Sequence, residues 1–198
     1  KPSKPDAAPL SAKSIKNIHG VLHKALKQAV LIGYLRTNPT EACILPRIIR
    51  KEMHPLEEDQ VAVFLREVQG HPHEYLYKIA LFTGLREGEV LGLGWEHIDF
   101  QAGTLTVKRQ LRREQKKGGE YYFSPPKNNK SRCLTLAPSV IQLFRLQKLE
   151  QNSMRMEAGD AWEEHGLIFT NQTGGYLSYR TVYDCFKRII RNIGAPAT

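Results

Sequence analysis

The sequence predicts a mainly α-helical protein with a small antiparallel β-sheet. Apolar residues recur at helical spacing over residues 11–32, 55–68 and 74–82, and again from residue 138 and over 179–193. Between the earlier and later helices lie three short strand-like stretches, at residues 104–107, 121–123 and 133–136. A stretch rich in Pro, Asn and Lys separates the last two, which predicts a basic loop between paired strands.

The longest predicted helix covers residues 11–32, between a capping Ser11 and a terminating Gly33. One side of it is apolar and should be buried, namely Ile15, Ile18, Leu22, Ala25, Leu26, Ala29 and Ile32. The opposite side carries Gly20 and four lysines, Lys13, Lys16, Lys24 and Lys27. We expect this basic side to lie along a DNA groove. The alternative interpretation is an ordinary solvated lysine face.

Residues 36–54 are predicted to be a linker, because Pro39 and Pro46 interrupt regular structure. Pro55 suits the first turn of the helix that follows the linker. This pattern predicts that the chain divides near residue 50.

Charge is distributed unevenly within a net charge of +9. Residues 1–51 and 101–135 are strongly basic, residues 52–100 are acidic, and residues 136–198 are nearly balanced. Two basic blocks that flank an acidic one are typical of a protein that holds a polyanion at two places. The alternative is a basic protein that has no nucleic-acid partner.

Several classes of protein are not supported by the sequence. No apolar run approaches the roughly 20 residues needed to cross a membrane. Because Cys43, Cys133 and Cys185 are far apart, we expect neither a disulfide framework nor a structural zinc site. We expect the protein to work in a reducing, intracellular setting. His19 and His23 lack an evident third metal ligand, so we expect them to face solvent or DNA. No nucleotide-binding loop is evident.

The most informative segment is Thr-Gly-Leu-Arg-Glu-Gly-Glu-Val-Leu-Gly-Leu at residues 83–93. Gly84 breaks the chain and places Arg86 at the start of a short helix. A guanidinium held there can bind two phosphate oxygens. Glu89, three residues further on, lies on the same helical face and can support the arginine. The alternative is an ordinary surface ion pair.

This segment, followed by Trp95-x-x-Ile98-Asp99, resembles the first sequence box of the tyrosine recombinases, and in particular the phage-type integrases. Residues 10–39 resemble the end of the core-binding domain of that family. The resemblance implies that Arg86 binds the scissile phosphate of a DNA strand.

The segment Pro-Lys-Asn-Asn-Lys-Ser-Arg at residues 126–132 is similar to the lysine hairpin of the same family. Lys127 matches the lysine that donates a proton to the leaving 5′ oxygen, although Asn128 stands where many relatives have threonine. We expect the neighbouring Lys130 and Arg132 to contact DNA.

The resemblance also indicates what this sequence does not contain. In the family, a stretch similar to residues 182–194 is followed by a His-x-x-Arg box, a further His or Trp, and a nucleophilic tyrosine. None of the eight tyrosines of this chain lies in that context, so the nucleophile is absent from it. We expect residues 1–50 to be the C-terminal part of a helical, SAM-like core-binding domain with its linker. Residues 51–198 should form the N-terminal part of a mixed helix–sheet catalytic domain.

The implied activity is site-specific recombination of double-stranded DNA through a 3′-phosphotyrosine intermediate, with no metal and no cofactor. The resemblance further implies a cytoplasmic, nucleoid-associated protein of bacterial or phage origin that has no membrane partner. We expect a longer parent protein to act as a tetramer on DNA. The 198-residue chain is expected to be a monomer that binds DNA without cleaving it.

Two other functions remain open at this stage. A non-catalytic DNA-binding module or regulator could use the same scaffold, and the reading frame beyond residue 198 distinguishes it from a recombinase. An RNA-binding protein would present exposed aromatic side chains for base stacking, for which only residues 121–123 are candidates.

Overall fold

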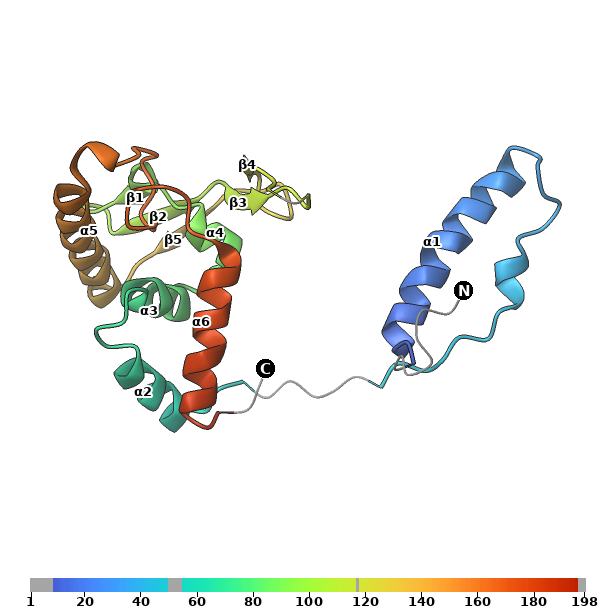
Figure 1. Cartoon of the computed structure of the whole chain (residues 1–198), viewed down its shortest axis with the longest axis horizontal. Helices are drawn as coiled ribbons and strands as arrows, with labels where there is room; N and C mark the ends of the chain where they lie inside the picture. Colours follow the sequence, from blue (N-terminus) through green and yellow to red (C-terminus); the bar gives the residue numbers. More distant parts are fainter. Residues whose placement is uncertain (1–8, 50–54, 117, 196–198) are drawn as a thin grey trace. The chain divides into compact units, whose positions relative to one another are not determined.

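The computed structural model describes residues 9–49, 55–116 and 118–195. The chain divides into two compact units, Lys1–Met53 and His54–Thr198. Figure 1 draws both units.

The first unit consists of helix α1 (Ala12–Leu31) and the short 3-10 helix η1 (Pro39–Ala42). The hydroxyl of Ser11 caps α1 by accepting a hydrogen bond from the Ser14 amide, and Gly33 follows the helix with a φ of 81°. The expected linker is therefore partly wrong, because residues 39–42 form a helical turn that packs against α1.

Polar side chains make the contact between α1 and η1. His19 Nε2 lies 3.0 Å from the Thr40 carbonyl oxygen, and His23 Nδ1 lies 2.8 Å from the Thr40 hydroxyl. The Asn38 amide donates to the His23 carbonyl, and both Asn38 and Thr40 are buried. The expectation that the two histidines face solvent or DNA is corrected: they hold the turn against the helix.

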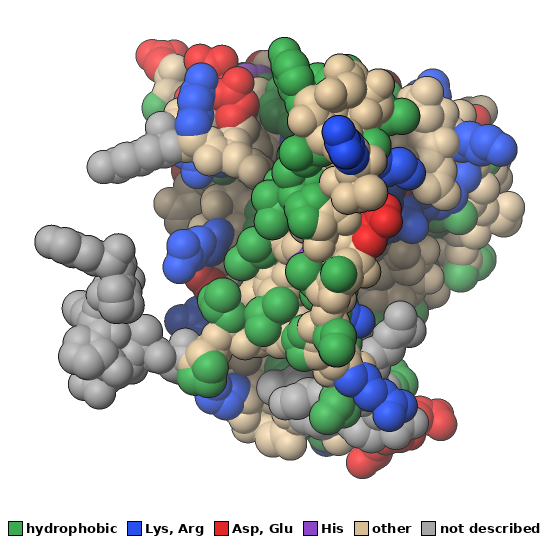
Figure 2. Space-filling model, turned by 90° about the vertical axis from the view of Figure 1, so that its right-hand side faces the viewer, with side chains coloured by type: hydrophobic (Ala, Val, Ile, Leu, Met, Phe, Trp, Pro, Cys, Tyr) green, Lys and Arg blue, Asp and Glu red, His purple; other side chains and the backbone are tan. Residues whose placement is uncertain are grey.

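This contact leaves much of the predicted apolar face of α1 uncovered. No residue of α1 is fully buried, and Ile18, Leu22 and Ile32 are each at least half exposed. The expected burial of that face is therefore wrong for the described residues, because η1 contacts the side that carries the histidines. Figure 2 shows hydrophobic side chains gathered in a band among Lys, Arg and other side chains on the face that it presents.

The second unit contains five α-helices among its described residues: α2 (Glu58–Glu67), α3 (Glu74–Thr83), α4 (Glu87–Leu91), α5 (Pro138–Ala158) and α6 (Tyr179–Asn192). Helix α2 begins after Pro55, not with it, since Glu57 is its N-cap residue and the Glu57 amide donates to the Gln60 side chain. Short 3-10 helices occupy Trp95–His97 (η2) and Gly159–Ala161 (η3).

The strands form two small antiparallel sheets where the sequence predicts one. The first sheet has the order β1–β2–β5, made of Ile98–Asp99, Thr104–Val107 and Arg132–Thr135. The second pairs β3 (Gln110–Arg113) with β4 (Tyr121–Ser124) as a hairpin that projects from the helical part of the unit (Figure 1). Strand β3 is missed by the pattern analysis because Gln-Leu-Arg-Arg does not alternate over its full length.

A hydrophobic core joins these elements. Phe144, Ile79, Leu93, Leu105 and Ile168 lose essentially all of their exposed surface, so α3, α5 and the first sheet share one interior. Helix α4 packs against β3 so closely that a Cβ atom on Gly92 would lie 2.8 Å from the Leu111 amide nitrogen. No helix in the described part of the chain is long and apolar enough to cross a membrane.

Candidate functional site

Arg86 is presented at the start of α4 by a sharp chain reversal. Gly84 ends α3 in the left-handed conformation, with a φ of 63°, which glycine adopts at little cost. Leu85 then anchors the turn in the core, and Arg86 takes the N-cap position of α4. The Arg86 side chain remains 59% exposed, so its guanidinium is fixed at the backbone and open to a ligand.

Glu89 is the buried acid beneath this arginine. Its side chain is only 1% exposed, and its Oε2 accepts the Arg86 backbone N–H at 2.9 Å. Its Oε1 accepts a second, longer hydrogen bond from Arg86 Nη1 at 3.2 Å. The predicted support of Arg86 by Glu89 is thus present as two hydrogen bonds in the structure.

Arg132, the first residue of β5, binds the same carboxylate through two hydrogen bonds. Its Nη1 donates to Glu89 Oε1 at 2.9 Å, and its Nη2 donates to Oε2 at 2.7 Å. These bonds, together with those from Arg86, lower the pKa of Glu89 to about 2. The structure therefore directs the Arg132 guanidinium towards Glu89, and the expected contact of Arg132 with DNA stays a prediction.

The loop that carries Lys127 is held at both ends near α4. At its start, Gln110 Nε2 donates to the Pro125 carbonyl at 2.6 Å, and the Gln110 side chain also lies against Gly88 of α4. At its end, Arg132 pairs with Glu89. Within the loop, Asn129 adopts a φ of 53° and its amide donates to the Pro126 carbonyl.

Lys127 and Lys130 are both exposed on this loop. The structure thus places them on a segment that is bonded to α4 at its end, through Arg132, and to Gln110 of β3 at its start. Their ammonium groups are not fixed by any hydrogen bond or ion pair within the described residues.

The β3–β4 hairpin is fixed by two arginines that the sequence analysis did not single out, one just before β3 and one at the turn end of β3. Arg109 donates from Nε to the Gly92 carbonyl at 2.9 Å, and its guanidinium lies 4.1 Å from the centre of the Phe123 ring. Arg113 lies 5.2 Å from the centre of the Tyr121 ring, which stacks on Tyr176. Residues 121 and 123 are therefore engaged in intramolecular contacts, which weakens their candidacy as an RNA-stacking surface.

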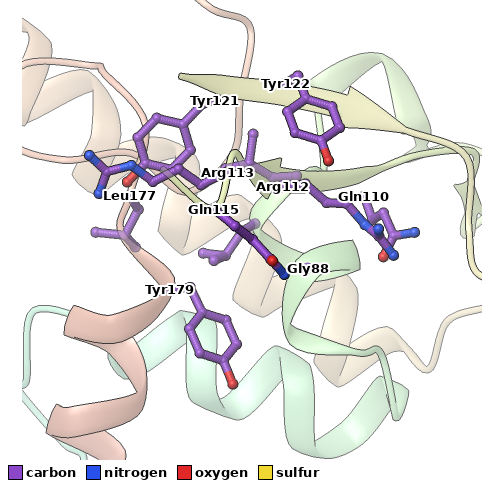
Figure 3. A pocket seen from close by; sticks show the side chains of 11 residues that line it. Gly88, Gln110, Arg112, Arg113, Gln115, Tyr121, Tyr122, Leu177 and Tyr179 are labelled. Atoms are coloured by element: carbon purple, nitrogen blue, oxygen red, sulfur yellow. The ribbon is translucent and has the colours of Figure 1, made fainter. Parts of the chain in front are cut away.

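An open pocket of about 530 Å³ lies between this hairpin, α4 and the beginning of α6. Figure 3 shows the side chains around it, and those that carry polar groups include Gln110, Arg112, Gln115, Tyr122 and Tyr179. Gly88 forms part of the α4 wall, so the pocket adjoins the helix that presents Arg86.

Glu87 is a second acid of α4 that the sequence analysis missed. Its Oε1 is buried and has no hydrogen-bond partner among the described residues. It lines a mostly apolar pocket of about 340 Å³ with Tyr77, Val182 and Phe186. Burial raises the pKa of Glu87 to about 7. Only the spacing of α3 and α6 brings these residues together, so no local sequence pattern could reveal the site.

The four lysines of α1 belong to the first unit. Lys13, Lys24 and Lys27 are exposed and Lys16 is partly exposed, as a solvated or DNA-facing surface requires. No group of three or more His, Cys, Asp or Glu side chains suited to a metal ion occurs among the described residues.

The chain matches a known protein family over most of its length. The sequence model of the phage integrase family matches residues 54–196, which is most of the chain. The chain belongs to the phage integrase family. The tyrosine recombinase resemblance read from residues 83–99 and 126–132 is thereby confirmed.

Two curated members of the integrase family illustrate the relationship. A XerC-like tyrosine recombinase of Caldanaerobacter subterraneus subsp. tengcongensis is 27% identical over 94% of this chain and 52% of its own length. An integrase of Streptomyces ambofaciens is 28% identical over 94% of this chain and 48% of its own length. The chain therefore spans about half the length of the relatives it matches.

Solved integrase structures share its fold. The Tn1549 transposon integrase, solved in complex with a circular intermediate DNA, aligns with a TM-score of 0.76 and 25% identity. The alignment covers 92% of this chain and 59% of the other. The predicted combination of helices with small antiparallel sheets is confirmed as a tyrosine recombinase fold.

Proposed function

We propose that this chain supplies the phosphate-binding part of a site-specific DNA recombinase. One observation carries the proposal: Arg86 is exposed on a braced turn, and the loop with Lys127 ends at Arg132, which is bonded to Glu89 of the helix that follows this turn. The start of the same loop is bonded to Gln110 of β3, which lies against that helix. In a chain of the integrase family, that arrangement supports the roles that the sequence resemblance implies, phosphate binding for Arg86 and proton donation for Lys127.

Arg86 would bind the non-bridging oxygens of the phosphate that is attacked. Its guanidinium carries a permanent charge and several donors in one plane, which match two phosphate oxygens. Because Glu89 already holds its backbone N–H and one Nη atom, little reorganisation is needed when negative charge accumulates on the phosphate. This preorganisation is the contribution that an exposed, unbraced arginine would lack.

Lys127 would donate a proton to the 5′ oxygen that leaves. An ammonium group can act as a general acid when it lies within hydrogen-bond reach of the leaving atom. The exposed position of Lys127 on a tethered loop allows such an approach once DNA is bound. The mechanism retains the energy of the broken bond in a covalent link to a tyrosine, which this sequence does not contain in the required context.

Double-stranded DNA is the proposed partner of both units. The lysines of α1 and the basic residues near the β3–β4 hairpin would contact several backbone phosphates, while the longer parent acts as a tetramer in recombination. The 198-residue chain alone would be a monomer that binds DNA and does not cleave it. We also infer that residues 1–50 correspond to the end of a core-binding domain and residues 51–198 to the beginning of a catalytic domain.

The proposal is tested by incubating the chain with a nicked duplex that traps covalent intermediates, and with an intact duplex at several salt concentrations. The expected result is a complex whose affinity falls steeply with salt and no covalent protein–DNA adduct. An adduct would overturn the proposed lack of cleavage. An affinity that does not change with salt would overturn binding through phosphates.

A further inference from the structure

The buried carboxylate of Glu89 accepts hydrogen bonds from two guanidinium groups, and the bonds differ in number and length. Glu89 receives two short hydrogen bonds from Arg132, at 2.9 and 2.7 Å, so that each of its oxygens is engaged. Arg86 contributes only one side-chain hydrogen bond to the same group, at 3.2 Å. The carboxylate is thus oriented by the arginine that comes from β5. It also accepts the Arg86 backbone N–H at 2.9 Å, but its bond to the Arg86 guanidinium is the longest of the set.

We propose that Arg132 is a positioning residue that keeps Arg86 available for phosphate. By holding both oxygens of Glu89, Arg132 prevents that carboxylate from forming a two-point ion pair with Arg86. This inference rests on the proposed role of Arg86 and adds a residue that acts through it. It replaces the direct DNA contact expected for Arg132 from the sequence.

The physical reason lies in the burial of Glu89. A carboxylate that is 1% exposed cannot be satisfied by water, so it bonds to whichever donors are near. Without Arg132, the nearest cation is Arg86, whose Nη1 already lies 3.2 Å from Oε1. A fork-to-fork pair with Arg86 would then occupy donors that the phosphate needs and would neutralise the charge that attracts it.

The position of Arg132 in the chain adds a second consequence. Arg132 follows the loop with Lys127 directly and begins strand β5. The same ion pair that restrains Glu89 therefore fixes the end of the lysine loop relative to α4. A lysine at position 132 would keep the charge, but its single ammonium could not engage both carboxylate oxygens in the same planar geometry.

A double-mutant cycle on the whole 198-residue chain tests the proposal. The affinity for a DNA duplex at fixed low salt is measured for Arg132→Gln in the wild-type background and in an Arg86→Ala background. We expect Arg132→Gln to weaken binding roughly 10-fold in the first background and by less than about 2-fold in the second, because it acts through Arg86. Arg112→Gln, which removes an exposed arginine of β3, is the matched control and should cost the same in both backgrounds.

Removing the competing carboxylate provides the second arm. Adding Glu89→Gln to Arg132→Gln should restore affinity to within roughly 3-fold of the wild type, since a neutral amide does not capture Arg86. If Arg132 contacts DNA directly, its substitution costs the same with or without Arg86, and Glu89→Gln restores nothing. Either result would overturn the positioning role. The proposal would also fail if the DNA affinity of every variant, Arg132→Lys included, simply fell in step with its midpoint of urea unfolding, because the role of Arg132 would then be structural.

A measurement on the free chain separates this inference from the proposed function. If Arg86→Ala left DNA affinity unchanged, the proposed phosphate contact would fail. The state of Arg86 is then read from the nitrogen NMR signals of its guanidinium without DNA. Positioning predicts that Arg132→Gln shifts these signals and slows guanidinium rotation, while Arg132→Gln with Glu89→Gln does not. Unchanged signals in Arg132→Gln would exclude the proposal irrespective of DNA binding.

Discussion

Arg132 and Glu89 form a two-point ion pair, with nitrogen–oxygen distances of 2.9 and 2.7 Å, that joins strand β5 to helix α4. The pair connects segments that are 43 residues apart and closes the lysine loop onto the turn of Arg86. It is the contact through which the two halves of the proposed phosphate site share one buried acid.

The first prediction concerns the pH dependence of that pair. The pKa of Glu89 is lowered from 4.5 to about 2 in the folded protein, so its ionised form stabilises the fold above pH 4.5. That stability is lost as the pH falls towards 2. Glu89→Gln should therefore destabilise the protein by roughly 1–3 kcal/mol at pH 7 and by much less near pH 2, in urea unfolding. An equal loss at both pH values would contradict the ion-pair account.

Glu87 should behave in the opposite way. Its folded pKa of about 7 lies above its ordinary value of 4.5, so the stability associated with its protonated form is lost as the pH rises through 7. Glu87→Gln should raise the free energy of unfolding by roughly 1–2 kcal/mol at pH 8, with no gain at pH 4. Glu157→Gln, at an exposed site on α5, is the control and should change stability by less than about 0.5 kcal/mol at both pH values. A stabilisation by Glu87→Gln that does not depend on pH would refute the burial argument.

The close approach of α4 to β3 predicts a graded response to added methyl groups. A Cβ on Gly92 would lie 2.8 Å from the Leu111 amide nitrogen, whereas one on Gly88 would lie 3.2 Å from the Leu111 carbonyl oxygen. Gly92→Ala should cost roughly 1–3 kcal/mol and Gly88→Ala less, because the added methyl at Gly92 would lie closer to backbone than real Cβ atoms do and the one at Gly88 would not. Gly20→Ala meets nothing within 4 Å and should be neutral or stabilising. Thermal unfolding that ranks Gly88→Ala as the more damaging change would show that the packing is wrong.

Removing lysines from helix α1 should change the salt dependence of DNA binding. Lys24 and Lys27 are exposed, and each phosphate contact that is removed should lower the slope of log affinity against log salt by about 1. Lys24→Gln and Lys27→Gln are therefore expected to give shallower slopes in titrations over a salt series. Lys78→Gln is the control, because its ammonium already pairs with Glu74, and the slope should not change. Slopes that stay at the wild-type value in the α1 variants would favour the solvated-face interpretation.

Local sequence patterns predicted those parts of the fold that depend on near neighbours. The helix that becomes α3, the strand β2, the turn at Gly84 and the position of Arg86 at a helix start all follow from spacing and from glycine. The support of Arg86 by Glu89 followed equally, because residues three apart share a helical face.

Features that depend on distant partners could not be predicted in this way. Arg132 reads as one more charge in a basic loop, and only the pairing of β2 with β5 brings it to Glu89. The sequence around His19 and His23 indicates surface residues, because their partner Thr40 lies far from them in the chain. The buried oxygen of Glu87 likewise depends on how α3 and α6 pack.

The central claim is that Arg86 and Lys127 act on one backbone phosphate. The most direct test uses a DNA duplex that the chain has selected from a random pool. An uncharged methylphosphonate replaces one backbone phosphate at a time, and the affinity of the protein for each duplex is measured. Substitution at several positions should weaken binding of the wild type, and at one position, the same for both variants, it should no longer weaken binding of Arg86→Ala or of Lys127→Ala. Two different positions, or none, would contradict the account.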